Sequence, residues 1–480
     1  MRKFILGLVL TLFAGFAGFQ STQSVRAADK PSYTIATDAT YAPFDFQADN
    51  GEYRGIDLDL LKEISKSQGF TYTLKPMSFN AAVQALDAKQ VDGVIAGMSI
   101  TPERKAKFDF SDPYYDSGEV MAVGKNSKIT SPKDLKGKTV ALKTGTVAAE
   151  YGKSLQKKYG FKVKYFNDSN TMYNDVINGN SAACFEDYPV MAYGIKNGMD
   201  LKIVTKPVGG GQYGFAVNKG MNKALITSFN KGLKQARKDG TYKKVVDRYL
   251  STKKTKLTAD SKSSRTVWGL LKTNKAAFLS GFWMTIKLTV ISIIFATILG
   301  ICLGVMGVVP SRILRGVSST IIYVFRGMPL MVLAFFIYIG IPNLTGDKIP
   351  AIVAGIIALT LNEGAYTGAF VKGGFKAVDK GQMEAARSLG LPYGKSMLRV
   401  IMPQGLRIMI PSFVNQFIIT LKDTSILSVI GLFELTQTGT IIISRNMEGF
   451  KVWTIIALIY IVVITLLTWL SNWAERRTRI

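Results

Sequence analysis

Five long apolar segments in the second half of the chain constrain its fold more than any other feature. They cover residues 282–309, 317–341, 349–371, 406–430 and 452–473. Each is long enough to cross a bilayer, and lipid admits only structures that satisfy every backbone polar group internally. The sequence therefore predicts an all-α membrane domain of five transmembrane helices within residues 276–480.

The basic residues between these segments predict which side of the membrane each loop faces. From residue 372 to residue 407 the chain carries seven Lys or Arg against two acids, Asp379 and Glu384. Arg312 and Arg315 follow the first segment, and three more arginines lie near the C-terminus. Loops rich in Lys and Arg stay in the cytoplasm. With five spans, all three basic regions face the cytoplasm and the first half of the chain lies outside the cell.

The first 28 residues have the pattern of a secretory signal peptide. Arg2 and Lys3 precede an apolar run from residue 4 to residue 19, and the small residues Ala27 and Ala28 follow. The alternative is a permanent anchor helix, but the run is short for a span and the small residues favour cleavage. Both alternatives place residues 29–252 outside the membrane.

The hydrophobic pattern of residues 29–252 predicts a soluble α/β domain. Strand-like runs cover residues 33–37, 91–96, 139–142 and 182–185, and helical patterns cover 56–67, 80–89, 147–158 and 221–237. This alternation is typical of a mostly parallel sheet. Ligands of such sheets bind beyond the carboxyl ends of the strands, and here those ends carry polar residues such as Asp38.

A motif of fixed spacing lies in the basic loop that precedes the fourth apolar segment. Glu384-Ala385-Ala386 is followed after three residues by Gly390, and Pro403 ends a second block, Val400-Ile401-Met402-Pro403. Residues 383–389 predict a short helix that ends at Gly390. The composition alone is also typical of a basic cytoplasmic loop without a partner.

The spacing resembles the EAA loop of ABC importer permeases. In that family the loop helix sits in a groove of a cytoplasmic ATPase subunit and passes its motion to the membrane helices. The resemblance implies that Glu384, Ala385, Ala386, Gly390 and Pro403 couple this chain to such a subunit. It also implies that two copies of the chain form a homodimer, because five spans make half a pathway.

Several motifs in the outer domain occur in one order. They are Ala36-Thr37-Asp38 to Phe44, Gly55 to Leu60, Thr101-Pro102-Glu103-Arg104 and Phe110 to Tyr115. Together they resemble the polar amino acid substrate-binding proteins, and within them the glutamine-binding-protein-like members, over residues 31–252. The resemblance implies a two-lobed, periplasmic-binding-protein-like (type II) fold that closes around one free amino acid.

Residues that hold the backbone of such a ligand follow from this resemblance. A carboxylate needs a fixed bidentate cation, which Arg104 offers, aided by backbone N–H groups near Ser99. The ammonium group needs buried acceptors. The expected acceptors are the Gly97 carbonyl, the Ser99 hydroxyl and the Asp187 carboxylate.

Five other residues are expected to hold the side chain of the ligand. Tyr41 and Phe79 would enclose its stem between two rings. Asp38 and Lys143 form a pair that can accept from and donate to a carboxamide. Glu186 stands where the glutamine-binding members carry a histidine, and it leaves the exact ligand open.

Glutamine is the expected substrate, with asparagine or glutamate as weaker ligands. A cationic ligand would meet Lys143 inside a dry pocket, which costs free energy. The alternative is a basic amino acid, arginine, lysine or histidine, because Asp38 and Glu186 could hold a guanidinium group. Val147 replaces a glycine of the glutamine-binding pattern and also leaves the choice open.

Composition excludes several other functions. The chain has no histidine, which excludes histidine catalysis and a histidine phosphorelay, and Cys184 and Cys302 are its only cysteines. The net charge of +27 comes without a nucleic-acid-binding module, so an anionic membrane or cell envelope is the expected partner of this charge, and no nucleic acid is expected. A glutamate-receptor-like channel would need its pore inside the receptor domain and a filter such as Thr-Val-Gly-Tyr-Gly, and the receptor region runs unbroken.

No ATPase domain is evident in the chain, so we expect a transport subunit and not an enzyme. ATP and Mg would bind to the separate ATPase subunit, and no cofactor or metal is expected in this chain. Residues 253–275 predict a polar linker and a pre-membrane segment. A receptor tethered in this way stays near the membrane, which suits a Gram-positive cell without an outer membrane.

Overall fold

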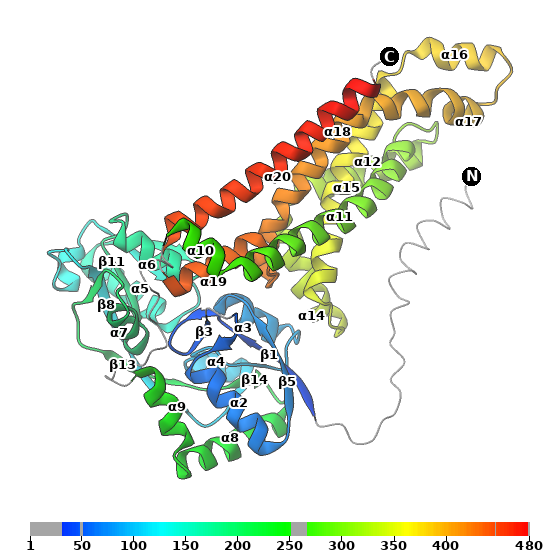
Figure 1. The fold of residues 1–480 in the computed structure, drawn as a ribbon. Helices are drawn as coiled ribbons and strands as arrows, with labels where there is room; N and C mark the ends of the chain where they lie inside the picture. The colour runs from blue at the N-terminus through cyan, green and yellow to red at the C-terminus, as the bar shows by residue number, and fades with distance from the viewer. Residues whose placement is uncertain (1–30, 49–50, 251–265, 447, 479–480) are drawn as a thin grey trace.

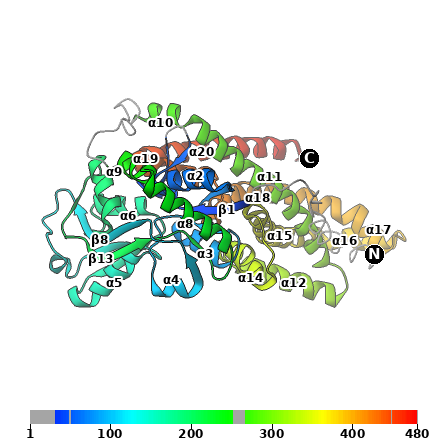
Figure 2. The same cartoon turned by 90° about the horizontal axis from the view of Figure 1, so that it is seen from below.

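The computed structural model describes residues 31–48, 51–250, 266–446 and 448–478. The predicted signal peptide and most of the predicted linker lie outside these residues. The described chain forms a two-lobed α/β receptor and a helical membrane domain, and the receptor sits at one end of the helices (Figure 1). The view from below places the receptor lobes and the helices α16 and α17 at opposite ends (Figure 2).

The first lobe is built on a five-stranded sheet. Its strand order is β5 (Thr71–Pro76), β1 (Ser32–Thr37), β6 (Gly93–Val94), β14 (Ala216–Asn218), β7 (Phe108–Phe110). Strand β1 runs parallel to β5 and β6, whereas β14 is antiparallel to its two neighbours. The helices of this lobe are α2 (Ile56–Gln68), α3 (Phe79–Asp87), α4 (Pro102–Lys107), α8 (Lys223–Lys238) and α9 (Thr241–Leu250).

The second lobe has a six-stranded sheet of the same mixed kind. Its strands are β10 (Lys162–Phe166), β9 (Thr139–Lys143), β11 (Ala183–Asp187), β8 (Tyr115–Gly124), β12 (Leu201–Ile203) and β13 (Val208–Tyr213). Strands β10, β9 and β11 are parallel, and β8, on the other side of β11, is antiparallel to it. Helices α5 (Val147–Tyr159), α6 (Ser169–Ile177) and α7 (Tyr188–Lys196) complete the lobe.

The chain crosses between the lobes twice, from β7 to β8 and from β13 to β14. Two such crossings allow the lobes to move as rigid bodies around a hinge. The predicted helices and strands are confirmed within a few residues. The strand expected at residues 91–96 is shorter, because only Gly93 and Val94 pair with neighbouring strands and the chain turns away at Gly97, whose φ is +54°.

The described residues of the membrane domain contain four helices long and apolar enough to cross a bilayer, and a bent pair that completes a fifth crossing if it counts as one span. The four lie in α11 (Lys275–Met306), α15 (Ala351–Ala377), α18 (Met402–Asp423) with the short helix η5 (Thr424–Ile430), and α20 (Gly449–Thr478). Small residues allow close packing of α11 on α15. A Cβ atom at Gly304 would lie 2.2 Å from Cγ1 of Val371.

The apolar segment expected at 317–341 as one span is broken. Helix α12 (Arg312–Gly327) ends before Pro329, and the chain continues through α13 (Leu330–Phe335), a π-helical turn (Phe336–Gly340) and α14 (Ile341–Thr345), with a bend of 100°. Pro329 cannot donate a backbone hydrogen bond and disfavours a helical conformation of Met328, whose ψ is 126°. The expected single span therefore bends at this proline.

The short helices α16 (Lys380–Ser388) and α17 (Tyr393–Ser396) lie at the end of the bundle away from the receptor (Figure 1). The receptor contacts the opposite end. There the helix α19 (Leu435–Asn446) lies against β2 (Thr40–Tyr41) and β3 (Asp45–Gln47), and Lys348 forms an ion pair of 2.9 Å with Asp92. This arrangement agrees with the predicted topology, in which the receptor and the basic loop lie on opposite sides of the membrane.

Candidate functional site

A small cavity of about 20 Å³ lies between the two lobes of the receptor. Its lining residues come from the carboxyl ends of strands and the starts of helices in both lobes. They are Tyr41, Phe79, Ala96, Gly97, Ser99, Arg104, Lys143, Thr146, Val147 and Asp187. Seven of the nine predicted ligand-binding residues are among them, and the other two, Asp38 and Glu186, lie directly behind this wall.

Arg104 joins the two lobes at one end of the cavity. Thr101 caps the start of α4 by accepting from the Arg104 amide, and this cap places Arg104 in the first turn of the helix. The guanidinium donates to the Ser99 carbonyl at 2.7 Å and, across the cleft, to the Gly145 carbonyl at 2.9 Å. It lies 5.3 Å from the centre of the Phe79 ring, so a planar cation is held over an aromatic face.

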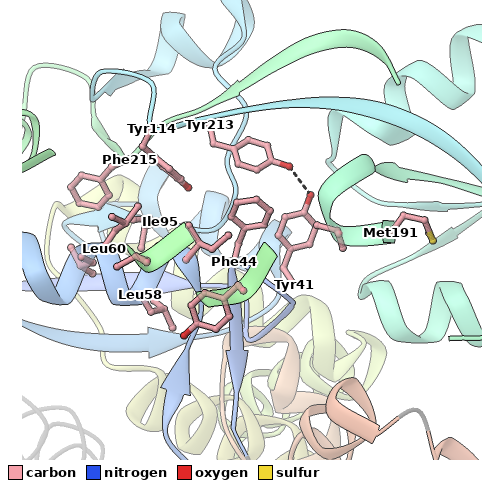
Figure 3. Packing of buried hydrophobic residues seen from close by; sticks show 14 of the residues in the cluster. Tyr41, Phe44, Leu58, Leu60, Ile95, Tyr114, Met191, Tyr213 and Phe215 are labelled. Carbon is pink, nitrogen blue, oxygen red and sulfur yellow. Dashed lines mark hydrogen bonds between the residues drawn. The ribbon is translucent and has the colours of Figure 1, made fainter. Parts of the chain in front are cut away.

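Asp187 forms the second link across the cleft. It is the last residue of β11, and its Oδ2 atom accepts hydrogen bonds from the hydroxyls of Tyr41 and Tyr213. Those two hydroxyls lie 3.2 Å apart and point toward one another (Figure 3). Burial raises the pKa of Asp187, whereas the two tyrosine hydrogen bonds lower it. The result is a buried carboxylate in reach of the Gly97 and Ser99 loop.

A buried ion pair forms the third link. Lys143, at the end of β9, places Nζ 2.5 Å from Oδ2 of Asp38, and both side chains are at most 2% exposed. Oδ1 of Asp38 accepts from the amide and hydroxyl of Thr40. Burial lowers the pKa of Lys143, but attraction by Asp38 and Glu186 outweighs burial and raises it. Lys143 also lies 5.0 Å from the centre of the Tyr41 ring.

Glu186 does not reach the cavity. Successive side chains of a strand point to opposite faces, so Glu186 and Asp187 of β11 diverge. The Glu186 carboxylate accepts from the Tyr173 hydroxyl at 2.7 Å and from Ser169 at 3.4 Å, both in α6. Burial and the charge of Asp187 raise its pKa to about 7.

Two further buried carboxylates hold the loops of the site in place. Asp57, in the first turn of α2, accepts from the Gly97 amide and the Tyr114 hydroxyl, each at 2.7 Å. Asp45 accepts from the Thr37 hydroxyl at 2.9 Å and from the Asp38 amide. Burial raises the pKa of Asp57 and outweighs the lowering effect of its two hydrogen bonds, so that the resulting pKa is about 7. These contacts fix the backbone on both sides of the cavity.

Sequence reasoning missed part of the wall. Thr146 caps α5 by accepting from the Ala149 amide, and the start of this helix faces the cavity. The run Thr144-Gly145-Thr146 before a helical pattern was a usable signal, since helix starts favour anions. Tyr213 gave no signal, because its hydroxyl meets that of Tyr41 in the other lobe only when the lobes are brought together.

The predicted coupling residues lie on the surface of α16 and the following turn. Glu384 and Ala385 are exposed, whereas Ala386 is 5% exposed and faces the bundle. Gly390 ends this region with a φ of +80°, and Leu389 beside it is 84% exposed. Pro403, in the first turn of α18, is also exposed. The helix is thus anchored on one face and free on the other.

The chain matches two protein families, one after the other along the sequence. Residues 33–252 match the bacterial extracellular solute-binding proteins, family 3, and residues 276–480 match the binding-protein-dependent transport system inner membrane component. The arginine-binding extracellular protein ArtP of Bacillus subtilis is 33% identical over 257 residues, which is 53% of this chain and 100% of that protein. The chain belongs to the amino acid ABC importers.

The receptor and the permease are joined in one chain here, whereas ArtP matches the receptor half and a second relative matches the permease half. The probable glutamine ABC transporter permease protein GlnM of B. subtilis is 33% identical over 208 residues, 43% of this chain and 96% of that protein. Two solved structures also match the receptor. The second substrate-binding domain of Lactococcus lactis GlnP shares 44% identity over 48% of this chain and 100% of that one, with a TM-score of 0.37. An ancestral arginine-binding protein bound to glutamine shares 38% identity over 47% of this chain and 99% of that one, with a TM-score of 0.43.

Proposed function

We propose that this importer takes up glutamine, with asparagine and glutamate as weaker substrates. The observation that carries the proposal is the buried pair of Asp38 and Lys143 beside the cavity. Together these two side chains are neutral, and they present one acceptor and one donor. A carboxamide offers the complementary donor and acceptor without bringing a net charge into a dry site.

The remaining roles are proposed from the same geometry. Arg104 binds the ligand carboxylate, and amide groups at the start of α5 near Thr146 assist it. Asp187, the Ser99 hydroxyl and the Gly97 carbonyl accept from the ammonium group. Phe79 and Tyr41 enclose the stem. At Arg104 and Asp187 the ligand replaces hydrogen bonds that now join the two lobes, so one molecule can hold the cleft closed.

A basic amino acid is the second candidate. It is favoured by the arginine-binding relative ArtP and by the carboxylate of Asp38, which lies directly behind the wall of the cavity at Lys143. The position of Lys143 opposes it, because a guanidinium would come close to a buried ammonium unless Lys143 moved away. The two candidates therefore predict opposite effects of removing Lys143 on ligand affinity: weaker binding if the ligand is glutamine, and tighter binding if the ligand is a basic amino acid.

The transport cycle is proposed from the family. A closed, loaded receptor docks on the outer end of the permease, and a separate ATPase subunit binds α16 through Glu384, Ala385, Ala386, Gly390 and Pro403. ATP and Mg bind to that subunit. Two copies of this chain form a homodimer with two docked ATPase subunits. The tethered receptor suits a Gram-positive cell, since it cannot diffuse away.

Calorimetric titration of the purified full chain with glutamine, asparagine, glutamate, arginine, lysine and histidine tests the ligand. Tight binding of glutamine, and loss of that binding in Asp187→Ala, is the expected result. Tighter binding of arginine than of glutamine would overturn the glutamine assignment and leave the importer intact. No binding of any of the six would overturn the ligand class.

A further inference from the structure

A second, larger cavity lies between the receptor and the permease. Its volume is about 290 Å³, which approaches the size of pockets that hold small-molecule ligands. The first lobe contributes residues that include Asp38, Thr40 and Ser78, and the second lobe contributes Asn167 and Asp168. The permease supplies the remaining wall. Its residues are Met331, Phe335, Ser428, Val429, Phe433, Gln437 and Thr440.

One buried ion pair separates this interface cavity from the ligand cavity. Asp38 lines the interface cavity, and Lys143, bonded to it at 2.5 Å, lines the ligand cavity. Ala39 and Thr40, which follow Asp38 in the chain, also line the interface cavity. Separation of Asp38 from Lys143, which belong to different lobes, would therefore join the two spaces. Opening of the receptor lobes produces that separation.

The chemistry of the interface cavity suits a free amino acid. Its polar wall combines two carboxylates, Asp38 and Asp168, with hydroxyl and amide side chains. Among the lining residues in the described part of the chain there is no Lys or Arg. The permease side offers three polar residues, Ser428 and the pair Gln437 and Thr440, which are three positions apart on α19 and so share one face of that helix. Aromatic and aliphatic residues complete the wall.

We propose that the interface cavity is a transfer chamber, the first space that the amino acid enters when it leaves the receptor. Gln437 and Thr440 receive its polar groups on the permease side, and the Asp38–Lys143 pair closes the receptor side. The Asp168 carboxylate attracts the ammonium group and repels an anionic side chain, and Asp38 adds to this effect once opening of the lobes separates it from Lys143. The chamber therefore discriminates against glutamate at the transfer step, after binding. This proposal rests on the proposed function.

Cavity-filling and polarity variants on α19 test the chamber in proteoliposomes that contain the full chain and its ATPase subunit. Thr440→Trp fills the chamber, and Gln437→Leu removes its amide. We expect glutamine uptake to fall about tenfold or more in Thr440→Trp, with glutamine affinity of the full chain changed less than about twofold, because neither residue touches the ligand cavity. Thr454→Trp on α20, where the threonine hydroxyl donates to the Phe450 carbonyl one turn before it, is the matched control and should leave uptake unchanged.

A cysteine-labelling measurement distinguishes a role of the chamber from a loss of uptake that is caused only by poor packing of the variant. In a background where Cys184 and Cys302 are replaced by Ala, Thr440→Cys is treated with a cationic and an anionic thiosulfonate reagent of similar size. The Asp168 carboxylate predicts that the cationic reagent reacts roughly threefold faster or more. Asp168→Asn, which keeps the cap on α6, should reduce that ratio. Bound glutamine during turnover should protect the thiol.

The outcomes separate this proposal from the proposed function. If wild-type chain neither binds nor transports glutamine, the proposed function fails. If wild type transports glutamine and Thr440→Trp transports it equally well, the transfer chamber fails and the proposed function stands. Equal reaction of the cationic and anionic reagents would overturn the charge discrimination.

Discussion

Replacement of Lys143 by methionine should change which amino acid the receptor prefers. The side chain of Lys143 is 2% exposed and its ammonium lies 2.5 Å from Asp38, which is 1% exposed. Methionine keeps much of the volume and removes the charge. The variant therefore leaves the Asp38 carboxylate buried without its cation, a loss that costs about 3–5 kcal/mol in comparable buried pairs.

A guanidinium ligand can supply the missing charge, whereas a carboxamide cannot. If about half of that cost is recovered on binding arginine, the ratio of arginine to glutamine affinity rises by about 2 kcal/mol, or roughly 30-fold. Titration of the full-length variant with both amino acids measures this ratio. The double variant Lys143→Met with Asp38→Asn is the control. It removes both charges, so the gain for arginine should disappear. An unchanged ratio in Lys143→Met would refute the role given to this pair.

Three further predictions follow from the site and the coupling loop. Arg104→Lys replaces a two-pronged donor by a point charge and should weaken glutamine binding about 10- to 100-fold in calorimetry, whereas unchanged affinity would contradict its role as carboxylate anchor. Burial raises the pKa of Asp57 to about 7, so its stabilising contribution is complete below the unfolded pKa near 4 and is lost as pH rises through 7. The melting temperature of the receptor should therefore fall between pH 5.5 and 8.5. Asp57→Asn should flatten that pH dependence. Leu389→Asp should abolish glutamine-stimulated ATP hydrolysis without changing ligand affinity. Leu398→Asp, at another exposed leucine of the same loop, should leave that hydrolysis intact. Equal loss of hydrolysis in both variants would contradict a specific contact at α16.

The sequence predicted most of the ligand cavity because its residues lie in short motifs that each end a strand or begin a helix. Gly97, Ser99 and Arg104 come from one such stretch, and their backbone and capping contacts are local. Glu186 shows the limit of this reasoning. Its place in the sequence, next to Asp187, suggested the cavity, but strand alternation turns it toward Tyr173.

Features that depend on how separate bodies meet could not be predicted. Tyr213 of the second lobe meets Tyr41 of the first lobe only across the closed cleft, and its sequence context is an ordinary strand. The position of the receptor on the permease, with Met77 against Gly431 and Lys348 paired with Asp92, leaves no periodic signal in either half. The sharp bend at Met328 and Pro329 occurs at a proline, which the sequence shows, but its angle depends on the packing of the neighbouring helices.

The most direct test of the account is ATP hydrolysis by the full chain and its ATPase subunit in liposomes. It is measured with and without each amino acid on the side of the membrane that carries the receptor. The account predicts that glutamine stimulates hydrolysis and is taken up, that arginine does neither at the same concentration, and that Asp187→Ala abolishes both effects of glutamine. Hydrolysis that does not respond to any amino acid would contradict the account, and a response to arginine alone would overturn the role given to Lys143.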